Sequence, residues 1–427
     1  MNVPRLEKEI GIEVYATKTL GTNGRLRQFP EDFVVEEVLE SGSVAKIEPP
    51  NIANIIGHGR YLVCVLVKRK MDIFQAVQMI ANKLDISTER IQIAGIKDAN
   101  AVTAQHVSIS RMLPEQATQI KTGNLWLYPL QFSNEKIHSG MLFGNRFHIT
   151  VRAVKQPKSP IIERLESTRQ ELLRLGGCPN FFGHQRFGTT RAITHTVGKH
   201  MLFGEWEEAA LAFLAKPGPY EHPESRQARQ RLLKAQNYKK ALGYFPLRLV
   251  YERQMISHLA KRHKDFVGAF HRLPRKLRQL FINAYQSYLF NRFLSQRIQD
   301  NMQLKKPLKE DYKLTLNNEN HLALPLIGYK LGPSTGRQGE IEKRILEEEG
   351  VEPHNFKVSS MPEISSKGGL RTALTQLIDF DMEKPARNNH NPSTKMIRLN
   401  LTLRKGSYAT IVLREFMKPR NPVKAGY

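Results

Sequence analysis

The stretch Ile93-Ala-Gly-Ile-Lys-Asp-Ala-Asn-Ala-Val-Thr-Ala-Gln-His-Val-Ser-Ile109 indicates both how the chain folds locally and where its chemistry lies. An apolar run over 90–96 predicts a strand that stops at Gly95, and a second run from His106 to Ile109 predicts another strand. The charged pair Lys97-Asp98 falls in the turn between them. A carboxylate at the end of a strand, beside a lysine, is well placed to act as a base or a nucleophile. The sequence therefore predicts that Asp98 carries the chemistry.

The composition is that of a folded and strongly basic chain. Its 427 residues are enough for two or three domains, and contents of 40% apolar and 25% charged residues are ordinary for a globular protein. The 65 lysines and arginines outnumber the 40 aspartates and glutamates, which gives a formal net charge of +25. A basic proteome can also produce such an excess, but charge this one-sided favours a polyanionic partner, most often nucleic acid.

Several classes of protein are disfavoured by what the sequence lacks. Cys64 and Cys178 are far apart and in apolar or turn contexts, as expected for reduced cysteines in the cytoplasm. The 14 histidines show no spacing typical of a zinc site. Residues 1–21 lack the apolar core of a signal peptide, and the longest apolar run, 61–67, is too short to cross a bilayer. We expect a cytoplasmic protein without a bound metal, a membrane segment or an obligate protein partner.

The first part of the chain mixes strands and helices without a regular alternation, which favours an α+β fold over a doubly wound one. The helix at its end is followed by Gly176-Gly177, a common stop signal. We expect strands over 33–37, 61–67, 125–132 and 146–154, and helices over 73–84 and 161–175.

The middle of the chain is different, because residues 194–304 show almost only helical periodicity. A helix-rich insert inside a sheet-bearing domain is the simplest architecture that explains this change. We expect a catalytic domain over 1–178, the insert over 179–370 and a return to the catalytic domain over 371–427. The further elements expected are loops at 216–224 and 273–274, an exposed connection over 304–319, a strand over 322–329, a helix over 339–349, and a polar stretch over 383–394 before a strand over 396–403.

Five segments match the signatures of one known family. The longest are Gly95–Gln105, which fits G-x-K-D-x-x-A-x-T-x-Q, and Asn180–Gly188, which fits N-[YF]-[YF]-G-x-Q-R-F-G. The stretch Arg27–Glu36 contains a third element, P-E-D-F-x-V-x-E. Weaker matches lie at 284–291 and 405–415, so that the order is as expected along nearly the whole chain. The chain therefore resembles the TruD-type tRNA pseudouridine synthases.

This resemblance implies an activity and a fold. The family isomerises uridine in RNA to pseudouridine: the bond from ribose to N1 of uracil breaks, the base turns, and a bond to C5 forms. One ionised carboxylate is needed, either to attack the sugar or the ring or to take a proton from the sugar, and no cofactor is needed. The expected fold is α+β, with the mixed, largely antiparallel sheet of pseudouridine synthases. The family's usual target implies uridine 13 in the D arm of tRNA, with other RNAs as further possible substrates.

The resemblance also implies a cationic partner for Asp98. The carboxylate must stay ionised in a site that excludes water, and a cation nearby stabilises the charged form. The family has a basic residue three positions before its Pro-Glu-Asp-Phe element, which here is Arg27. Lys97 points the other way if the strand pleat continues through the turn, which leaves it a structural or a phosphate-binding role.

Aromatic residues are required because a stacked base cannot reach a carboxylate, so the target nucleotide must be flipped out. By resemblance, Phe147 is expected to stack on the flipped uracil and Asn145 to hydrogen-bond to it. Phe33 would line the same pocket. Both phenylalanines also suit ordinary core positions at the start of a strand, and for Phe33 this alternative has nearly equal weight.

Three further features have a less definite meaning. Thr103 and Gln105 are expected to orient the Asp98 loop. The stretch Phe182–Phe187 either contacts RNA, shapes the floor of the pocket or forms a tight turn between domains. Basic residues gather within 226–240, 261–264 and 272–278, which suggests a surface for an RNA backbone.

Two other functions fit parts of the sequence. A non-catalytic RNA-binding protein or RNA chaperone could keep this fold, although the intact Gly-x-Lys-Asp turn argues against it. A DNA-binding protein is disfavoured because neither a helix-turn-helix nor a zinc-finger pattern occurs.

Overall fold

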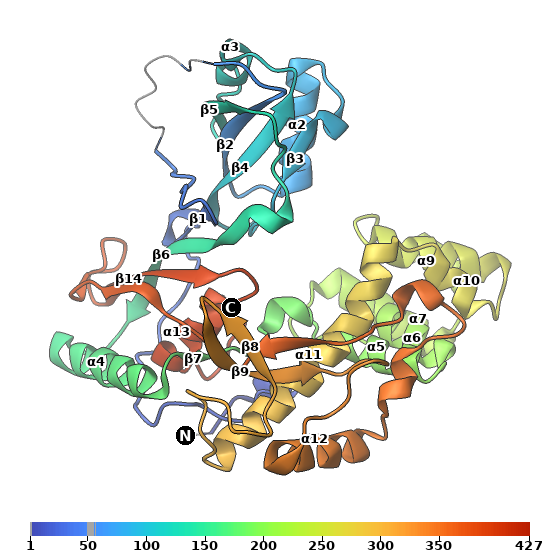
Figure 1. Ribbon diagram of the computed structural model, residues 1–427. Helices are drawn as coiled ribbons and strands as arrows, with labels where there is room; N and C mark the ends of the chain where they lie inside the picture. The colour runs from blue at the N-terminus through green and yellow to red at the C-terminus, as the bar shows by residue number, and fades with distance from the viewer. Residues whose placement is uncertain (1, 49–54, 56) are drawn as a thin grey trace.

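A nine-stranded sheet runs through the molecule and joins a smaller and a larger lobe, as the computed structural model shows (Figure 1). The structure describes residues 2–48, 55 and 57–427. The strand order is β12-β14-β6-β1-β4-β2-β5, with β13 paired to β14 and β3 paired to β4. The strands are β1 (Phe33–Leu39), β2 (Tyr61–Arg69), β3 (Ile91–Ile93), β4 (Val102–Ser110), β5 (Leu125–Ser133), β6 (Leu142–Val154), β12 (Ile378–Met382), β13 (Ala386–Arg387) and β14 (Lys395–Arg404).

The central pair of this sheet, β1 and β4, is parallel, with Val34 opposite Val102. The other strand pairs of the sheet, within the described residues, are antiparallel. Since parallel strands start at the same edge, the segments that precede β1 and β4 meet there. The expected mixed, largely antiparallel α+β fold is confirmed.

The smaller lobe has a core of its own beneath helix α2 (Ile73–Leu84). Ile73, Ala76 and Ile80 lie on one face of this helix and are buried, as their spacing requires. The Asp72 side chain accepts a hydrogen bond from the backbone of Phe74 and caps the first turn. Helix α3 (Pro114–Thr118) lies at the far end of the lobe (Figure 1).

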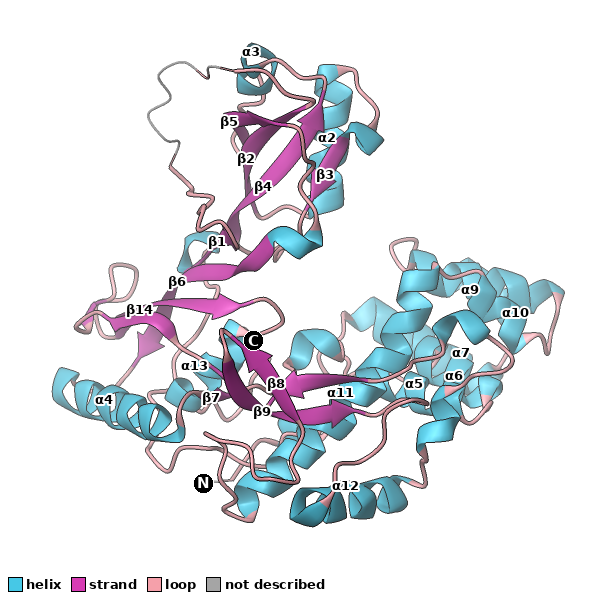
Figure 2. Cartoon of the chain, in the orientation of Figure 1, coloured by secondary structure: helices cyan, strands magenta, loops and turns pink. Residues whose placement is uncertain are grey.

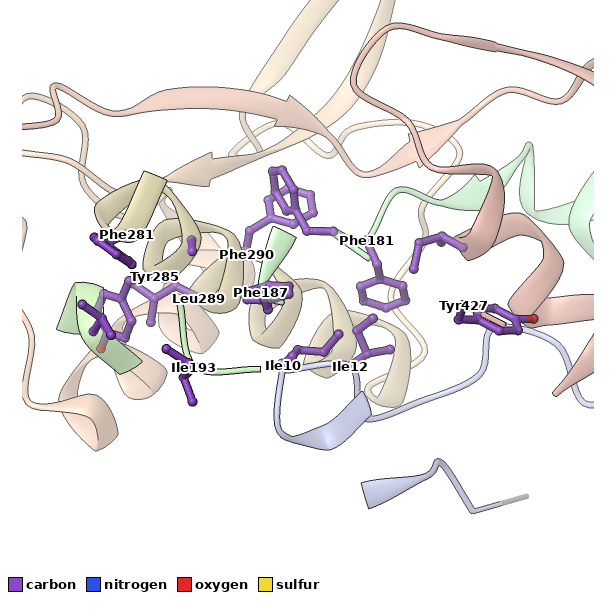
Figure 3. Packing of buried hydrophobic residues seen from close by; sticks show 14 of the residues in the cluster. Ile10, Ile12, Phe181, Phe187, Ile193, Phe281, Tyr285, Leu289, Phe290 and Tyr427 are labelled. Carbon is purple, nitrogen blue, oxygen red and sulfur yellow. The ribbon is translucent and has the colours of Figure 1, made fainter. Parts of the chain in front are cut away.

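The larger lobe has one continuous core that reaches from the sheet into the helical region. Helices α4 (Lys158–Leu175) and α13 (Ala409–Met417) belong to its sheet-bearing part, and the long helix α11 (Arg275–Gln299) to its helical part. Figure 3 shows Ile10, Phe181 and Phe290 gathered in this core, although they are far apart in sequence. The sheet-bearing part and the helical part of the larger lobe therefore share one core.

Helices dominate the insert (Figure 2). Two short strands, β7 (Cys178–Pro179) and β11 (Leu374–Thr375), pair with each other, so the segment predicted as an insert begins and ends at neighbouring places. A three-stranded sheet, β10-β9-β8, covers part of it. The remaining elements are α1 (Arg5–Lys8), α5 (Thr194–Leu202), α6 (Trp206–Leu214), α7 (Pro223–Ala235), α8 (Tyr238–Tyr244), α9 (Val250–Lys261), α10 (Phe266–His271), α12 (Gly336–Glu349), β8 (Lys313–Leu316), β9 (Glu319–Leu326) and β10 (Gly369–Thr372).

Most predicted elements are confirmed, and helix 73–84 has the predicted bounds. The strand before Asp98 ends at Ile93, before the predicted stop at Gly95. Strand β4 begins at Val102, four residues before the predicted His106, so Asp98 lies in a loop over 94–101. Most residues of the connection expected over 304–319 are exposed, but it also contains β8, which forms a hairpin with β9. Asn317 and Asn318, both with positive φ, make its tight turn. Within 383–394, β13 pairs with β14.

In the described part of the chain, every helix is too short or too polar to cross a membrane.

Candidate active site

Asp98 lies in the loop over 94–101, at the sheet edge where β1 and β4 begin. A buried lysine on the neighbouring strand β2 fixes this loop. Lys68 Nζ donates hydrogen bonds to the backbone oxygens of Asp98 (2.8 Å) and Met71 (2.9 Å). Burial lowers the pKa of Lys68 to about 8, although the Asp98 carboxylate acts in the opposite direction. The position of the Asp98 backbone is thus set by a side chain of the neighbouring strand.

Lys97 lines the same cavity as Asp98, but its amine pairs with a buried carboxylate inside the protein. Its Nζ lies 2.6 Å from Glu37 Oε1, and both side chains are almost completely buried. Burial raises the pKa of Glu37, but hydrogen bonds from His106 and the charge of Lys97 outweigh this and leave the pKa below its ordinary value. Because the side chain of Lys97 is 4% exposed and its ammonium group is already paired, this geometry favours its structural role over phosphate binding.

Gln105 supports the loop in the predicted way. Its Nε2 donates to the backbone oxygen of Gly95 at 3.1 Å. Thr103 is buried on the same strand, and its hydroxyl has no hydrogen-bond partner among the described residues. The contact of Gln105 therefore fits the orienting role, whereas Thr103 reaches the loop through no hydrogen bond.

Arg27 meets Asp98 from the segment before β1. Its Nη2 lies 3.6 Å from Asp98 Oδ2, and its Nη1 donates to the backbone oxygen of Gly426 at 2.8 Å. The guanidinium carbon also lies 4.0 Å from the ring centre of Phe33. Arg27 has a φ of +53°, a conformation that non-glycine residues rarely adopt and that often occurs at functional sites. Burial lowers the pKa of Arg27 and the charge of Asp98 opposes this shift, so the group remains a cation at neutral pH.

The ion pair between Arg27 and Asp98 is a single contact, and a third of the Asp98 side chain is exposed (34%). Solvent weakens such a pair to roughly 1 kcal/mol. The water-excluding environment that the chemistry requires is therefore incomplete in this structure, and a bound base would have to complete it.

Two phenylalanines lie beside this pair. The rings of Phe33 and Phe147 are 6.0 Å apart and nearly perpendicular, and both are buried. Asn145 lies two residues before Phe147 on β6, on the same face of the sheet. The Asn145 Oδ1 atom is buried and has no hydrogen-bond partner among the described residues. A buried oxygen of this kind is costly unless a ligand or water satisfies it.

Gln185 is a further polar contact of Asp98, which sequence reasoning did not include among the site residues. Its Nε2 lies 3.4 Å from Asp98 Oδ1. It belongs to the short 3-10 helix His184–Arg186, inside the Phe182–Phe187 stretch whose role was left open. The signal was the motif itself, since an exposed glutamine between aromatic residues suits a pocket wall. Of the roles considered for Phe182–Phe187, the structure therefore agrees best with shaping the pocket.

Asp98 and Gln185 line two cavities and lie between them. One cavity, of about 230 Å³, also contains Phe33, Asn145 and Phe147. The other, of about 490 Å³, also contains Arg27 and Lys70. Further lining residues that the sequence analysis did not include are Ile96, Tyr408 and Thr410 in the first cavity, and Gln28, Thr189 and Thr190 in the second. Within the described residues, no three His, Cys, Asp or Glu side chains are grouped as metal ligands would be.

Comparisons with known proteins identify the family of the chain. The family model of tRNA pseudouridine synthase D (TruD) matches residues 9–322 and 312–416. The chain belongs to the TruD family. A “Probable tRNA pseudouridine synthase D” of Methanosarcina acetivorans is 37% identical over 98% of both proteins. One of the same name from Methanopyrus kandleri is 39% identical over 84% of this chain and 86% of that protein.

A solved structure shows the same fold. The crystal structure of a TruD-family protein from Methanosarcina mazei has a TM-score of 0.83 and 35% identity to this chain. The similarity covers 99% of this chain and 100% of that one. The resemblance to TruD proteins is thus confirmed, and with it the enzyme class, since the family consists of tRNA pseudouridine synthases, which are isomerases. The three strongest family motifs in the sequence contain Asp98, Gln185 and Arg27, and these three side chains lie together.

Proposed function

We propose that this TruD protein converts uridine 13 in the D arm of tRNA to pseudouridine, with Asp98 as the essential carboxylate. One observation supports this most directly: Asp98 lies beside Arg27 at the boundary of a small cavity that contains two phenylalanine rings and an unsatisfied amide oxygen. The other function considered, a non-catalytic RNA-binding protein or chaperone, gives no reason for a carboxylate and a cation to be placed together there.

The smaller cavity would receive the uracil. Its volume, about 230 Å³, is below the usual range for drug-sized ligands, about 300–1,000 Å³, and suits one base better than a whole nucleotide. Phe147 would contact the face of the base, and Phe33 would support Phe147 and Arg27 from the core. A uridine must be flipped out of its stack to enter.

Asn145 would select uracil. Its Oδ1 lacks a hydrogen-bond partner and can accept the N3–H of uracil. Cytosine has no hydrogen on N3, so it would leave this oxygen unsatisfied. The cost of an unpaired buried group is about 1–3 kcal/mol, enough to discriminate between the two pyrimidines.

Asp98 would act at the bond between ribose and uracil. The N1 glycosidic bond breaks and a bond from C5 to the same ribose carbon forms, while the hydrogen leaves C5 and a proton is bound at N1, so that the product is an isomer. The carboxylate would attack the sugar, attack the ring or remove a proton from the sugar, and each role needs it ionised and fixed. Arg27 stabilises the charge, and Gln185 restrains the second oxygen.

Replacement of Asp98 by asparagine tests this proposal. Asp98→Asn keeps the size and the contact with Gln185, and we expect the single-turnover rate of pseudouridine formation to fall at least about 1,000-fold. We expect tRNA affinity to change less than about threefold. Asp85→Asn, at the exposed C-cap of α2 where asparagine is well tolerated, is the matched control. A normal rate in Asp98→Asn, or product at a position other than 13, would contradict the proposal.

A further inference from the structure

The insert contains a cavity that the proposed reaction does not use. Its volume is about 830 Å³, and it lies along helix α9, with the end of α8 and the segment after α10 at its borders. Figure 1 shows α9 and α10 at the end of the molecule opposite to α4 and β14. A ligand here would therefore be bound far along the protein from the sheet that carries Asp98.

One face of α9 lines this cavity. Val250, Gln254, Ser257 and Lys261 line it and are spaced at i, i+4, i+7 and i+11, which places them on one side of the helix. Val250 is 53% exposed, and the neighbouring Leu247 is 80% exposed. Exposed apolar side chains in the lining of an otherwise polar cavity favour a ligand with an apolar face.

A cation at the rim is held in a fixed orientation. His258 Nε2 contacts Asp265 Oδ2 at 2.8 Å, and Arg272 Nε donates to His258 Nδ1 at 3.1 Å. The terminal nitrogens of Arg272 have no acceptor among the described residues and remain available to a ligand. Lys261 adds a second, exposed cation at the same rim. An arginine that is positioned in advance loses less entropy when it binds an anion.

The charge around the cavity is suited to a polyanion. Residues 226–278 contain fifteen lysines and arginines but two acidic residues, so this segment supplies more than half of the excess that gives the chain a net charge of +25. A density of this kind is the electrostatic footprint of a nucleic-acid-binding surface.

We infer that this cavity binds an unpaired nucleotide of the tRNA, one that is not the target uridine. The base would lie against Leu247 and Val250, and the adjacent phosphates would contact Lys261 and Arg272. The nucleotide must be unpaired because a duplex covers the faces of its bases. This inference depends on the proposed function for the identity of the RNA, and it adds a second point of recognition away from Asp98.

Paired variants of the cavity test the inference. We expect Leu247→Ala combined with Lys261→Ala to weaken tRNA binding about tenfold and to raise KM by a similar factor, with kcat unchanged. The slope of log affinity against log salt should fall by about one. Leu173→Ala combined with Arg174→Ala removes an exposed leucine and an exposed cation from α4, at the opposite end of the molecule, and should change affinity less than about twofold. Equal effects of the two pairs would overturn the inference.

A comparison of RNA probes tests the contact with the base. Leu247→Ala alone should weaken binding of a short single-stranded oligoadenylate several-fold and leave an RNA duplex of equal length unaffected. An equal loss for both probes would overturn the base contact, and equal competition by polyglutamate would overturn RNA as the ligand. These binding measurements are made in the Asp98→Asn protein. If Asp98 is not the catalytic group, the Asp98→Asn protein still forms product. If the cavity does not bind RNA, the cavity substitutions leave the affinity of this protein unchanged.

Discussion

The Asp98 site and the cavity on α9 are constructed in opposite ways. At Asp98, the groups in contact come from distant segments: Arg27, Gln185 and Gly426 each lie far from the loop in sequence. The cavity on α9 takes its lining from one continuous stretch, residues 242–272. The first depends on the whole fold, whereas the second depends on local helices and on a high density of charge.

This difference implies different responses to mutation. A centre made of a few single contacts should lose most of its activity when one contact is removed. A surface with many exposed cations should lose affinity in small steps, because each phosphate contact contributes a modest and salt-dependent part.

Arg27 should give the largest effect after Asp98 itself. Arg27→Met removes the cation beside Asp98 and the hydrogen bond to Gly426, and we expect kcat/KM to fall about 100-fold. Single-turnover kinetics with tRNA measure this. Arg27→Lys keeps the charge but cannot contact both partners as a planar fork does, so we expect an intermediate loss. If Arg27→Met were as active as the wild type, the ion pair would have no role in the reaction.

Lys68 should have a smaller effect, because it acts on the backbone of Asp98. Lys68→Met has similar volume and leaves the carbonyl oxygens of Met71 and Asp98 without their donor. We expect kcat to fall about tenfold with little change in KM, and amide hydrogen exchange to become faster over 94–101. Lys83→Met, on the exposed end of α2, is the control. Unchanged exchange in this loop would show that Lys68 does not position it.

Glu342 should affect stability and leave the chemistry unchanged. It accepts hydrogen bonds from Ser334 and Gln338, and burial raises its pKa from 4.5 to about 7. Since the folded state binds this proton more tightly, the stability it provides is complete below pH 4.5. This stability is lost as the pH rises to about 7, by up to about 3 kcal/mol.

Glu342→Gln should remove this pH dependence. We expect the difference in unfolding free energy between pH 5 and pH 8 to be smaller in the variant than in the wild type, measured by urea denaturation at both pH values. Glu347→Gln, exposed on the same helix α12, should behave as the wild type. An unchanged pH dependence in Glu342→Gln would mean that Glu342 does not titrate in this range.

The sequence predicted much of the candidate site because the resemblance assigned its residues to recognisable motifs. The structure brings Arg27, Phe33, Asn145 and Phe147 around Asp98 as expected. Helix 73–84 was predictable from periodicity, since one of its faces is buried and the other is exposed.

Other features could not be predicted, for definite physical reasons. Gly426 contributes a backbone oxygen, and no residue type encodes such a contact. Lys68 follows an apolar run and looks like the solvated end of a strand, although its amine is buried. The start of β4 at Val102 was missed because Thr103 and Gln105 are polar but buried, which hides the alternation of apolar residues. The division into lobes depends on which strand faces share a core, which periodicity does not show.

The contact of Arg27 with Gly426 has a consequence for how the protein is made. The two residues are separated by 399 positions, so a growing polypeptide on the ribosome lacks this acceptor until synthesis has reached residue 426. Domains generally form in the order in which they are translated, and contacts between distant residues form slowly. The helices of the insert are translated before β14 and α13. A nascent chain would therefore acquire its basic helices first and the contact that fixes Arg27 last.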